Sequence, residues 1–114
     1  MSKIINKENA DSYIWGTNCL SHILSMNDEI SIKQELMPTG SKEQLHFHQK
    51  SNQFFYILKG QATFYLEEEI FLLNPKDCLS VAKNTKHFIA NESNDEIEFL
   101  VISQPNSNND RINI

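Results

Sequence analysis

The stretch that decides the fold is GSKEQLHFHQKSNQFFYILKG, from Gly40 to Gly60. His46 and His48 stand one residue apart in it, and a run of aromatic and branched residues follows them. Side chains on a β-strand alternate between its two faces, so both histidines point to the same side of an extended segment. On a helix they would point about 200° apart, because each residue turns the chain by about 100°. The stretch therefore predicts a strand that carries half of a metal site.

The rest of the chain repeats a pattern of short strands between turn signals. Residues 29–37 alternate apolar and polar side chains with period two, and residues 61–67 do the same after Gly60. Turn-forming residues separate such segments, as at 38–40 and 74–77. About eight short strands, with no convincing helical period, predict an all-β sandwich or barrel.

Length and charge limit the organisation and the partners. The 114 residues suffice for one domain with a single core. We expect residues 1–14 to form a loose, flexible N-terminal arm, residues 15–103 to form the domain and residues 104–114 to form a tail. A net charge of −5, without clustered Lys and Arg, argues against nucleic acid as a partner.

The N-terminus, the apolar runs and the cysteines predict a cytoplasmic protein that does not enter a membrane. No continuous apolar segment near the N-terminus resembles a secretory signal. The longest apolar runs are far shorter than the ~20 residues that a membrane helix requires. Cys19 and Cys78 are too few and too far apart for a disulfide framework, which suits free thiols in a reduced compartment.

The strand at 54–58, with the sequence FFYIL, is apolar on both faces. A strand in a sheet with one face in water would alternate, so we expect the outer face of this strand to be covered as well. A second copy of the chain would cover it in a homodimer. The alternative is that the N-terminal arm folds back over the same face.

The spacing of residues in the opening stretch resembles the first motif of the cupin superfamily. Five residues stand at the positions of that motif: Gly40, His46, His48, Gln53 and Gly60. Gln53 occupies the position where glutamate is usual. The second cupin motif is matched at His87 and Asn91, while its two glycines and its proline are replaced. The resemblance covers residues from about 29 to 103 and is carried mainly by the first motif.

The resemblance implies a double-stranded β-helix of the jelly-roll type, a cupin barrel with a divalent transition metal inside one end. By the same resemblance the metal is held by His46, His48, Gln53 and His87. Iron, zinc, nickel and manganese all remain open as the metal, because imidazole ligands suit several of them. The structural alternative is a site that has lost its metal and remains a polar pocket.

The substitution at Gln53 changes the chemistry that the resemblance implies. An amide oxygen supplies neither a negative charge nor a base. We therefore expect weaker metal binding than with glutamate, and a metal that acts as a stronger Lewis acid toward an anionic ligand. Gln53 shares strand parity with Phe55 and Ile57, which makes these two side chains the candidates for contact with a small-molecule ligand. The alternative for such residues is a place in the core.

Three classes of function remain open from the sequence. The first is a metal-dependent enzyme on a small organic anion, either a dioxygenase or an isomerase or lyase, such as a sugar-phosphate isomerase. The second is a non-catalytic module that binds a small molecule, and the third is a structural homodimer with a vestigial site. The superfamily contains all of the enzyme types, so the resemblance does not choose between them. No catalytic residue is identified: Glu35 is expected on a solvated strand face rather than in the site as an acid or base.

Overall fold

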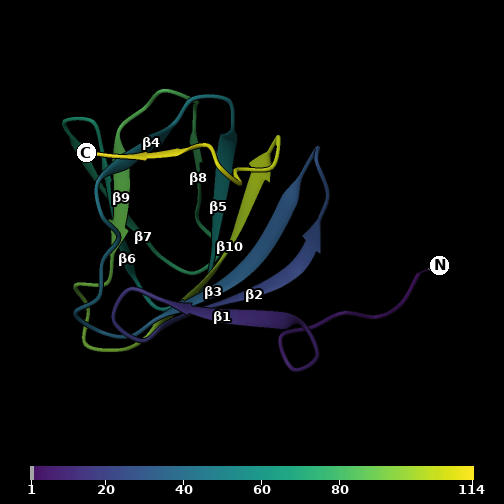
Figure 1. Ribbon diagram of the computed structural model, residues 1–114. Coiled ribbons are helices and arrows are strands. Elements are labelled where there is room, and N and C mark those ends of the chain that lie inside the picture. The colour runs from purple at the N-terminus through teal and green to yellow at the C-terminus, as the bar shows by residue number, and fades with distance from the viewer. Residues whose placement is uncertain (1) are drawn as a thin grey trace.

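The computed structural model describes residues 2–114, and in this part of the chain every regular element is a β-strand (Figure 1). The strands are β1 Asp11–Trp15, β2 Cys19–Met26, β3 Ser31–Met37, β4 His46–His48, β5 Asn52–Lys59, β6 Ala62–Leu66, β7 Glu69–Leu73, β8 Cys78–Val81, β9 His87–Ala90, β10 Ile97–Gln104 and β11 Arg111–Asn113. The expected all-β class is confirmed. Since residues 2–114 contain no helix, none is long and apolar enough to cross a bilayer.

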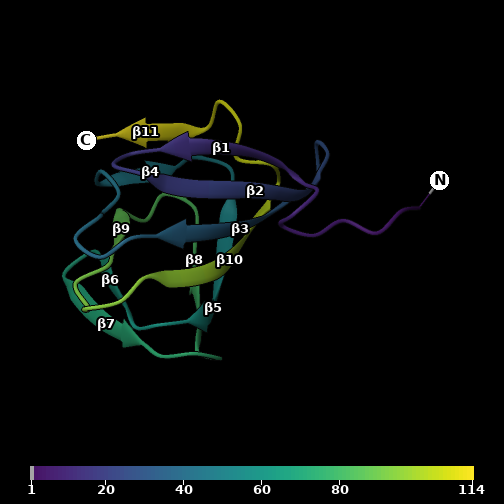
Figure 2. The same cartoon turned by 90° about the horizontal axis from the view of Figure 1, so that it is seen from below.

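Two antiparallel sheets face each other and form the barrel (Figures 1 and 2). One sheet has six strands in the order β1-β2-β3-β10-β5-β8, and the other has five in the order β11-β4-β9-β6-β7. β10 lies between β3 and β5, so the chain crosses between the sheets rather than pairing each strand only with its successor. This arrangement is the expected jelly-roll, double-stranded β-helix.

Alternating residues on the inner faces of the two sheets build the core. On β10 every second side chain is buried, and Phe99 is paired with Ile57 of β5. The ring of Phe55 meets that of Phe64, from the opposite sheet, edge to face at 4.8 Å between ring centroids. Such aromatic contacts hold the two sheets together in the closed part of the barrel.

The glycine that ends the first motif is required by close packing. Gly60 has a φ of +78°, and a Cβ atom there would lie 2.6 Å from the carbonyl oxygen of Glu96. No L-residue side chain fits at that distance, and the left-handed backbone region favours glycine. The tight turn after β5 returns the chain for β6, in the opposite sheet.

The two ends of the chain contain strands that the sequence analysis did not expect. Of the expected loose arm, 1–14, residue 1 lies outside the described residues, and residues 11–14 belong to β1, which pairs with β2. The expected tail, 104–114, starts with the last residue of β10 and includes β11, which pairs with β4. β11 has three residues and one apolar side chain, Ile112, so it leaves little trace in a hydrophobic pattern. β1 carries Tyr13, Ile14 and Trp15, but these three are consecutive and show no period-two alternation.

Candidate metal centre and ligand cavity

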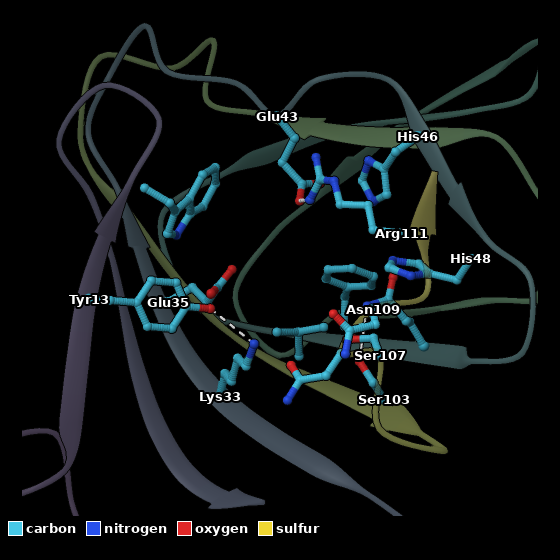
Figure 3. Close-up of a pocket in the computed structure, with 15 residues that line it drawn as sticks. Tyr13, Lys33, Glu35, Glu43, His46, His48, Ser103, Ser107, Asn109 and Arg111 are labelled. Atoms are coloured by element: carbon cyan, nitrogen blue, oxygen red, sulfur yellow. Dashed lines mark hydrogen bonds and ion pairs between the residues drawn. The ribbon is translucent and has the colours of Figure 1, made fainter. Parts of the chain in front are cut away.

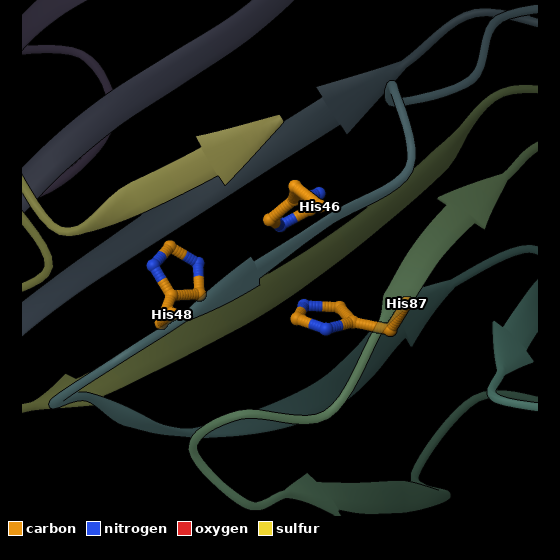
Figure 4. Close-up of side chains that lie close together, drawn as sticks. All are labelled: His46, His48 and His87. Atoms are coloured by element: carbon orange, nitrogen blue, oxygen red, sulfur yellow. The ribbon is translucent and has the colours of Figure 1, made fainter. Parts of the chain in front are cut away.

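Three histidines come together inside one end of the barrel (Figure 4). His46 and His48 are buried on the inner face of β4, and His87 is the first residue of β9, directly opposite His46 in the pairing of the two strands. One ring nitrogen of each histidine lies within 4.8 Å of the others. The period-two interpretation of the His-x-His pair therefore holds, and the third histidine arrives from the neighbouring strand.

The hydrogen bonds of the rings leave lone pairs for a metal. Nδ1 of His46 lies 2.7 Å from the carbonyl oxygen of Gln44, and Nδ1 of His87 lies 2.8 Å from that of Thr85. Because a carbonyl only accepts, each Nδ1 carries the proton and each Nε2 is left with its lone pair. Nδ1 of His48 is buried without a hydrogen-bond partner among residues 2–114.

Burial keeps the three rings neutral at neutral pH. It lowers the pKa of His46 to about 3 and that of His48 to about 4, and it also lowers the pKa of His87. A neutral imidazole is the form that binds a transition metal. Protons therefore compete weakly with a metal for these nitrogens at neutral pH.

The side chain of Gln53 completes a set of donors that fits a cation. Its amide nitrogen donates to Oγ of Ser103 at 3.0 Å, and its carbonyl oxygen lies 3.2 Å from Nε2 of His87. With the proton of His87 on Nδ1, two acceptors face each other with no hydrogen between them, an arrangement that a shared cation would stabilise. The three nitrogens and the amide oxygen thus fit a divalent transition metal, whose identity the ligand types leave open.

A cavity of about 280 Å³ lies beside the histidines (Figure 3). Gln53 and Phe55 line it, as the parity of β5 predicted. Ile57 does not: it is fully buried in the core beside Phe99. Two residues further along the strand from Phe55, its side chain lies deeper in the barrel than the cavity reaches, so the expected ligand contact of Ile57 is corrected.

Glu35 lines the same cavity, which corrects its expected place on a solvated face. It is only 8% exposed, and burial raises the pKa of its carboxyl group. β3 alternates as predicted, but Ser31, Lys33 and Glu35 face the inside of the barrel, whereas Ile32 and Leu36 face outward. Periodicity separates the two faces of a strand, and it does not say which face is covered.

A second buried carboxyl group and an arginine lie on the histidine side of the cavity. Glu43 accepts a hydrogen bond from the backbone N–H of Ile89 and lies 3.5 Å from Nη1 of Arg111. Burial raises the pKa of Glu43 to about 7 in spite of this arginine. Arg111 comes from β11, in the segment expected to be a tail, and no sequence signal marks it.

Asp110, the residue before Arg111, holds the C-terminal segment against the site. Its carboxylate accepts hydrogen bonds from the backbone N–H groups of the turn 49–51, which connects His48 to the strand of Gln53. Burial by itself would raise the pKa of Asp110, but these hydrogen bonds outweigh it and the pKa is lowered. One carboxylate thus positions a turn between two expected ligands and the strand that carries Arg111.

The sequence comparisons agree with this geometry. Residues 33–103 match the family model described as a cupin domain. The chain belongs to the cupin family. An uncharacterized protein of Methanocaldococcus jannaschii is 33% identical to this cupin over 75 residues, which are 66% of this chain and 60% of that protein. The cupin thus spans about 60% of the length of that relative.

Solved structures give the same fold. The polyketide cyclase RemF from Streptomyces resistomycificus is 14% identical, with a TM-score of 0.87 over 100% of this cupin and 86% of that chain. A sugar phosphate isomerase of the cupin superfamily from Silicibacter pomeroyi is 16% identical, with a TM-score of 0.79 over 91% of this cupin and 76% of that chain. At such low identity the likeness shows the fold alone.

Proposed function

We propose that this cupin is a metal-dependent enzyme that moves a proton on a small organic anion, as an isomerase or a lyase does. The observation that carries the proposal is that the buried carboxyl group of Glu35 lines the same cavity as His46 and His48, two of the three clustered neutral histidines. A bound divalent metal would supply a Lewis acid that polarises an oxygen of the ligand. A side chain that accepts and returns a proton is the other part that such a reaction needs.

The residues of the cavity divide these tasks. The imidazoles of His46, His48 and His87 and the amide of Gln53 would hold the metal, and they bring no negative charge to it. An anionic ligand is therefore not repelled by the donor set itself. Burial raises the pKa of Glu35, which makes its carboxylate a stronger base than a solvated glutamate. The aromatic wall at Phe55 excludes water from one side of the ligand.

One structural neighbour is a sugar phosphate isomerase, which supports a reaction of this class. Isomerisation of a carbonyl compound requires removal of a proton next to a carbonyl group. The oxygenase and the non-catalytic binding module from the sequence analysis are alternative outcomes of the test below.

Proton exchange in heavy water tests the proposal. The protein, loaded with Zn²⁺, Mn²⁺, Fe²⁺ or Ni²⁺ in separate samples, is incubated in D₂O with a panel of 2-oxo acids, sugar acids and sugar phosphates. We expect NMR to show deuterium at the carbon next to a carbonyl group, or a changed product, with at least one metal and none in the metal-free protein. Oxygen consumption would indicate an oxygenase instead. A ligand that raises the melting temperature without being altered would indicate the binding module.

We also propose that the cupin forms a homodimer through the outer face of the six-stranded sheet. Phe54 and Tyr56 point to this face from β5, and they are paired with Ile102 and Leu100 of β10. β3 adds further apolar side chains to the same face. A sheet whose outer face is this apolar is typically covered by another layer. The N-terminal segment contacts this face through Lys7, which forms an ion pair with Glu98 of β10.

Sedimentation at micromolar concentration tests the dimer. We expect the protein to sediment as a dimer and the variant Leu100→Glu to sediment as a monomer, because a carboxylate would be buried in the interface. The matched control is Leu72→Glu, an exposed leucine on β7 of the other sheet. A monomeric wild-type protein would contradict the proposal.

We expect the protein to act in the cytoplasm. Both cysteines are free thiols in the structure, Cys19 buried and Cys78 exposed. An exposed thiol is best preserved in a reduced compartment.

A further inference from the structure

We propose that the ligand of this cupin carries two anionic groups, one for the metal and one that binds Lys33 and Tyr13 on the opposite wall of the cavity. The inference rests on the proposed function and names its substrate class: a small organic acid with a second carboxylate or a phosphate. Figure 3 shows Lys33 and Tyr13 on one side of the cavity, and His46 and His48 on the other.

The ammonium group of Lys33 points into the cavity with hydrogen-bonding capacity left. Lys33 lies on the inner face of β3, two residues before Glu35, and its side chain is half-buried. Nζ donates to Oη of Tyr13 at 2.9 Å and lies 5.4 Å from the centroid of that ring. A lysine ammonium has three N–H donors, so two remain for a ligand.

No carboxylate neutralises Lys33 within ion-pair distance in residues 2–114. The ion pairs in this part of the chain belong to Lys7, Lys59 and Arg111. Glu35 is near enough for the charge of Lys33 to act on the pKa of Glu35, but the two side chains form no hydrogen bond. A half-buried cation without a counter-ion is a binding point for an anion from outside.

Arg111, the other cation of the cavity, is already engaged. Its Nε donates to Oδ1 of Asn113 at 2.9 Å, its Nη2 donates to the carbonyl oxygen of Gln44 at 3.3 Å, and its Nη1 lies 3.5 Å from Glu43. Each of its three nitrogens thus has a partner within the protein, and its charge is balanced by the carboxylate of Glu43. Lys33 has no such ion pair and differs from Arg111 in that respect.

Trp15 adds a further donor on the side of β1. Its Nε1 is buried and has no hydrogen-bond partner among residues 2–114, and the residue lines the same cavity as Lys33. An unpaired buried N–H is costly, and a ligand oxygen would satisfy it. The N–H of Trp15, the hydroxyl of Tyr13 and the ammonium of Lys33 together favour an oxygen-rich anionic group.

The positions of the two binding points limit the ligand. The histidines belong to the five-stranded sheet and Lys33 to the six-stranded sheet, so the two points face each other across the barrel. The cavity between them, about 280 Å³, is at the small end of the range for ligand sites. A ligand with one anionic group would engage one wall, whereas a small acid with two such groups would engage both.

Calorimetric titration with matched acids tests the inference. The probes are lactate and malate, which share a 2-hydroxy acid group and differ in a second carboxylate. Glycerate and 3-phosphoglycerate make the same comparison for a phosphate. We expect the zinc-loaded wild-type protein to bind the doubly anionic member of at least one pair about tenfold more tightly or better, as a charge-assisted hydrogen bond would give.

Substitution at Lys33 separates this inference from a general effect of charge. We expect Lys33→Met to lose the preference for the doubly anionic acid and to keep the affinity for its singly anionic partner. Tyr13→Phe should lose part of the preference. The matched control is Lys83→Met, an exposed lysine outside the cavity, which should bind like the wild-type protein.

Two kinds of outcome would contradict the inference. If lactate or glycerate binds and the second anionic group brings no advantage, or if Lys33→Met keeps that advantage, the inference is wrong and the proposed function stands. If none of the four acids binds to the zinc-loaded protein, the inference fails, and the proton-exchange experiment with its wider panel decides the proposed function separately.

Discussion

The two walls of the cavity come from different sheets and differ in how their polar groups are satisfied. On the five-stranded side, His46 and His87 each donate Nδ1–H to a backbone carbonyl, so the direction of the remaining lone pair is set before any metal arrives. On the six-stranded side, Lys33 and Trp15 keep donors without partners in the protein. The five-stranded side supplies the three histidines, and the six-stranded side supplies Gln53 of β5 together with the unpaired donors that suit a ligand.

This difference reflects how each wall is supported. Asp110 accepts hydrogen bonds from the turn 49–51, and β11, which follows it, pairs with β4. These contacts fix the position of β4, which carries His46 and His48 and forms the histidine wall together with β9 and its His87. The polar side chains of β3 are placed inside the barrel by strand pairing with β2 and β10, and few contacts fix their ends. The metal side is therefore the more preorganised of the two, because its histidines are held by further hydrogen bonds.

The largest expected effect comes from removing two of the three clustered histidines. The double variant His46→Ala, His48→Ala should lose essentially all bound metal, because two of the three nitrogen donors are gone. Metal content is measured by mass spectrometry on protein purified without added chelator, and circular dichroism checks that the strands are retained. His22→Ala, a histidine outside the cavity that is hydrogen-bonded to Ser12, is the control. Equal metal content in the wild-type protein and the double variant would contradict the proposed metal site.

The next effect separates chemistry from metal binding. Glu35→Gln should slow proton exchange on the substrate by about 10²–10⁴-fold, because an amide cannot accept or return the proton. Its metal content should equal that of the wild-type protein. Glu29→Gln, at an exposed position before β3, is the matched control. A variant at Glu35 that is as fast as the wild-type protein would assign the proton transfer to another group.

A smaller change is expected when a negative charge replaces the neutral amide of Gln53 among the expected metal ligands. Gln53→Glu should bind Zn²⁺ at least about tenfold more tightly, because a carboxylate adds Coulombic attraction that the amide lacks. Asn52→Asp adds the same charge on the same strand, but with the side chain on the other face, and controls for the change in net charge. Competition with a fluorescent zinc chelator measures both affinities. Equal gains in the two variants would show that Gln53 does not contact the metal.

The smallest effect concerns Asp110, which holds the turn that follows His48. Asp110→Asn should lower the melting temperature at pH 7 by about 5 °C, because charge-assisted hydrogen bonds to the turn 49–51 are weakened. The folded-state pKa of Asp110 is lowered, so its stabilisation is present above the unfolded value of 3.8 and is lost as the pH falls through the folded value.

The pH dependence of the melting temperature tests whether the ionised form of Asp110 is responsible. The difference in melting temperature between wild type and Asp110→Asn should shrink as the pH is lowered from 7 to about 2.5, because the carboxyl group is then neutral in both states. Asp28→Asn, at an exposed turn, should show no such trend. A difference that stays constant with pH would mean that the ionised form of Asp110 does not hold the turn.

Much of the histidine wall follows from the sequence. The spacing of His46 and His48 puts both side chains on one face of β4, because strand periodicity is a local property of the backbone. Gln53 lies on β5 of the other sheet, and its place among the expected ligands came from the resemblance to the first cupin motif. Gly60 is explained by local geometry together with one close contact, to Glu96. His87, which no local pattern connects to the other two histidines, was predicted from the resemblance to the second cupin motif.

The opposite wall depends on the tertiary structure. Glu35 and Lys33 alternate with apolar residues as a solvated strand face would, and the same pattern results when the polar face lines a cavity. Ile57 shares the parity of Phe55 and still lies in the core, since depth along the barrel axis is not encoded in parity. Arg111 reaches the cavity from β11, a strand of three residues held by backbone pairing.

The sequence alone thus determined the strand that carries the histidines, the face they share and the substitution at Gln53. Only the tertiary structure decided that Lys33 and Glu35 of β3 point inward and that they line one cavity with His46 and His48. The physical reason is that alternation distinguishes the two faces of a strand, whereas the strands and sheets that pack around it determine which face is enclosed.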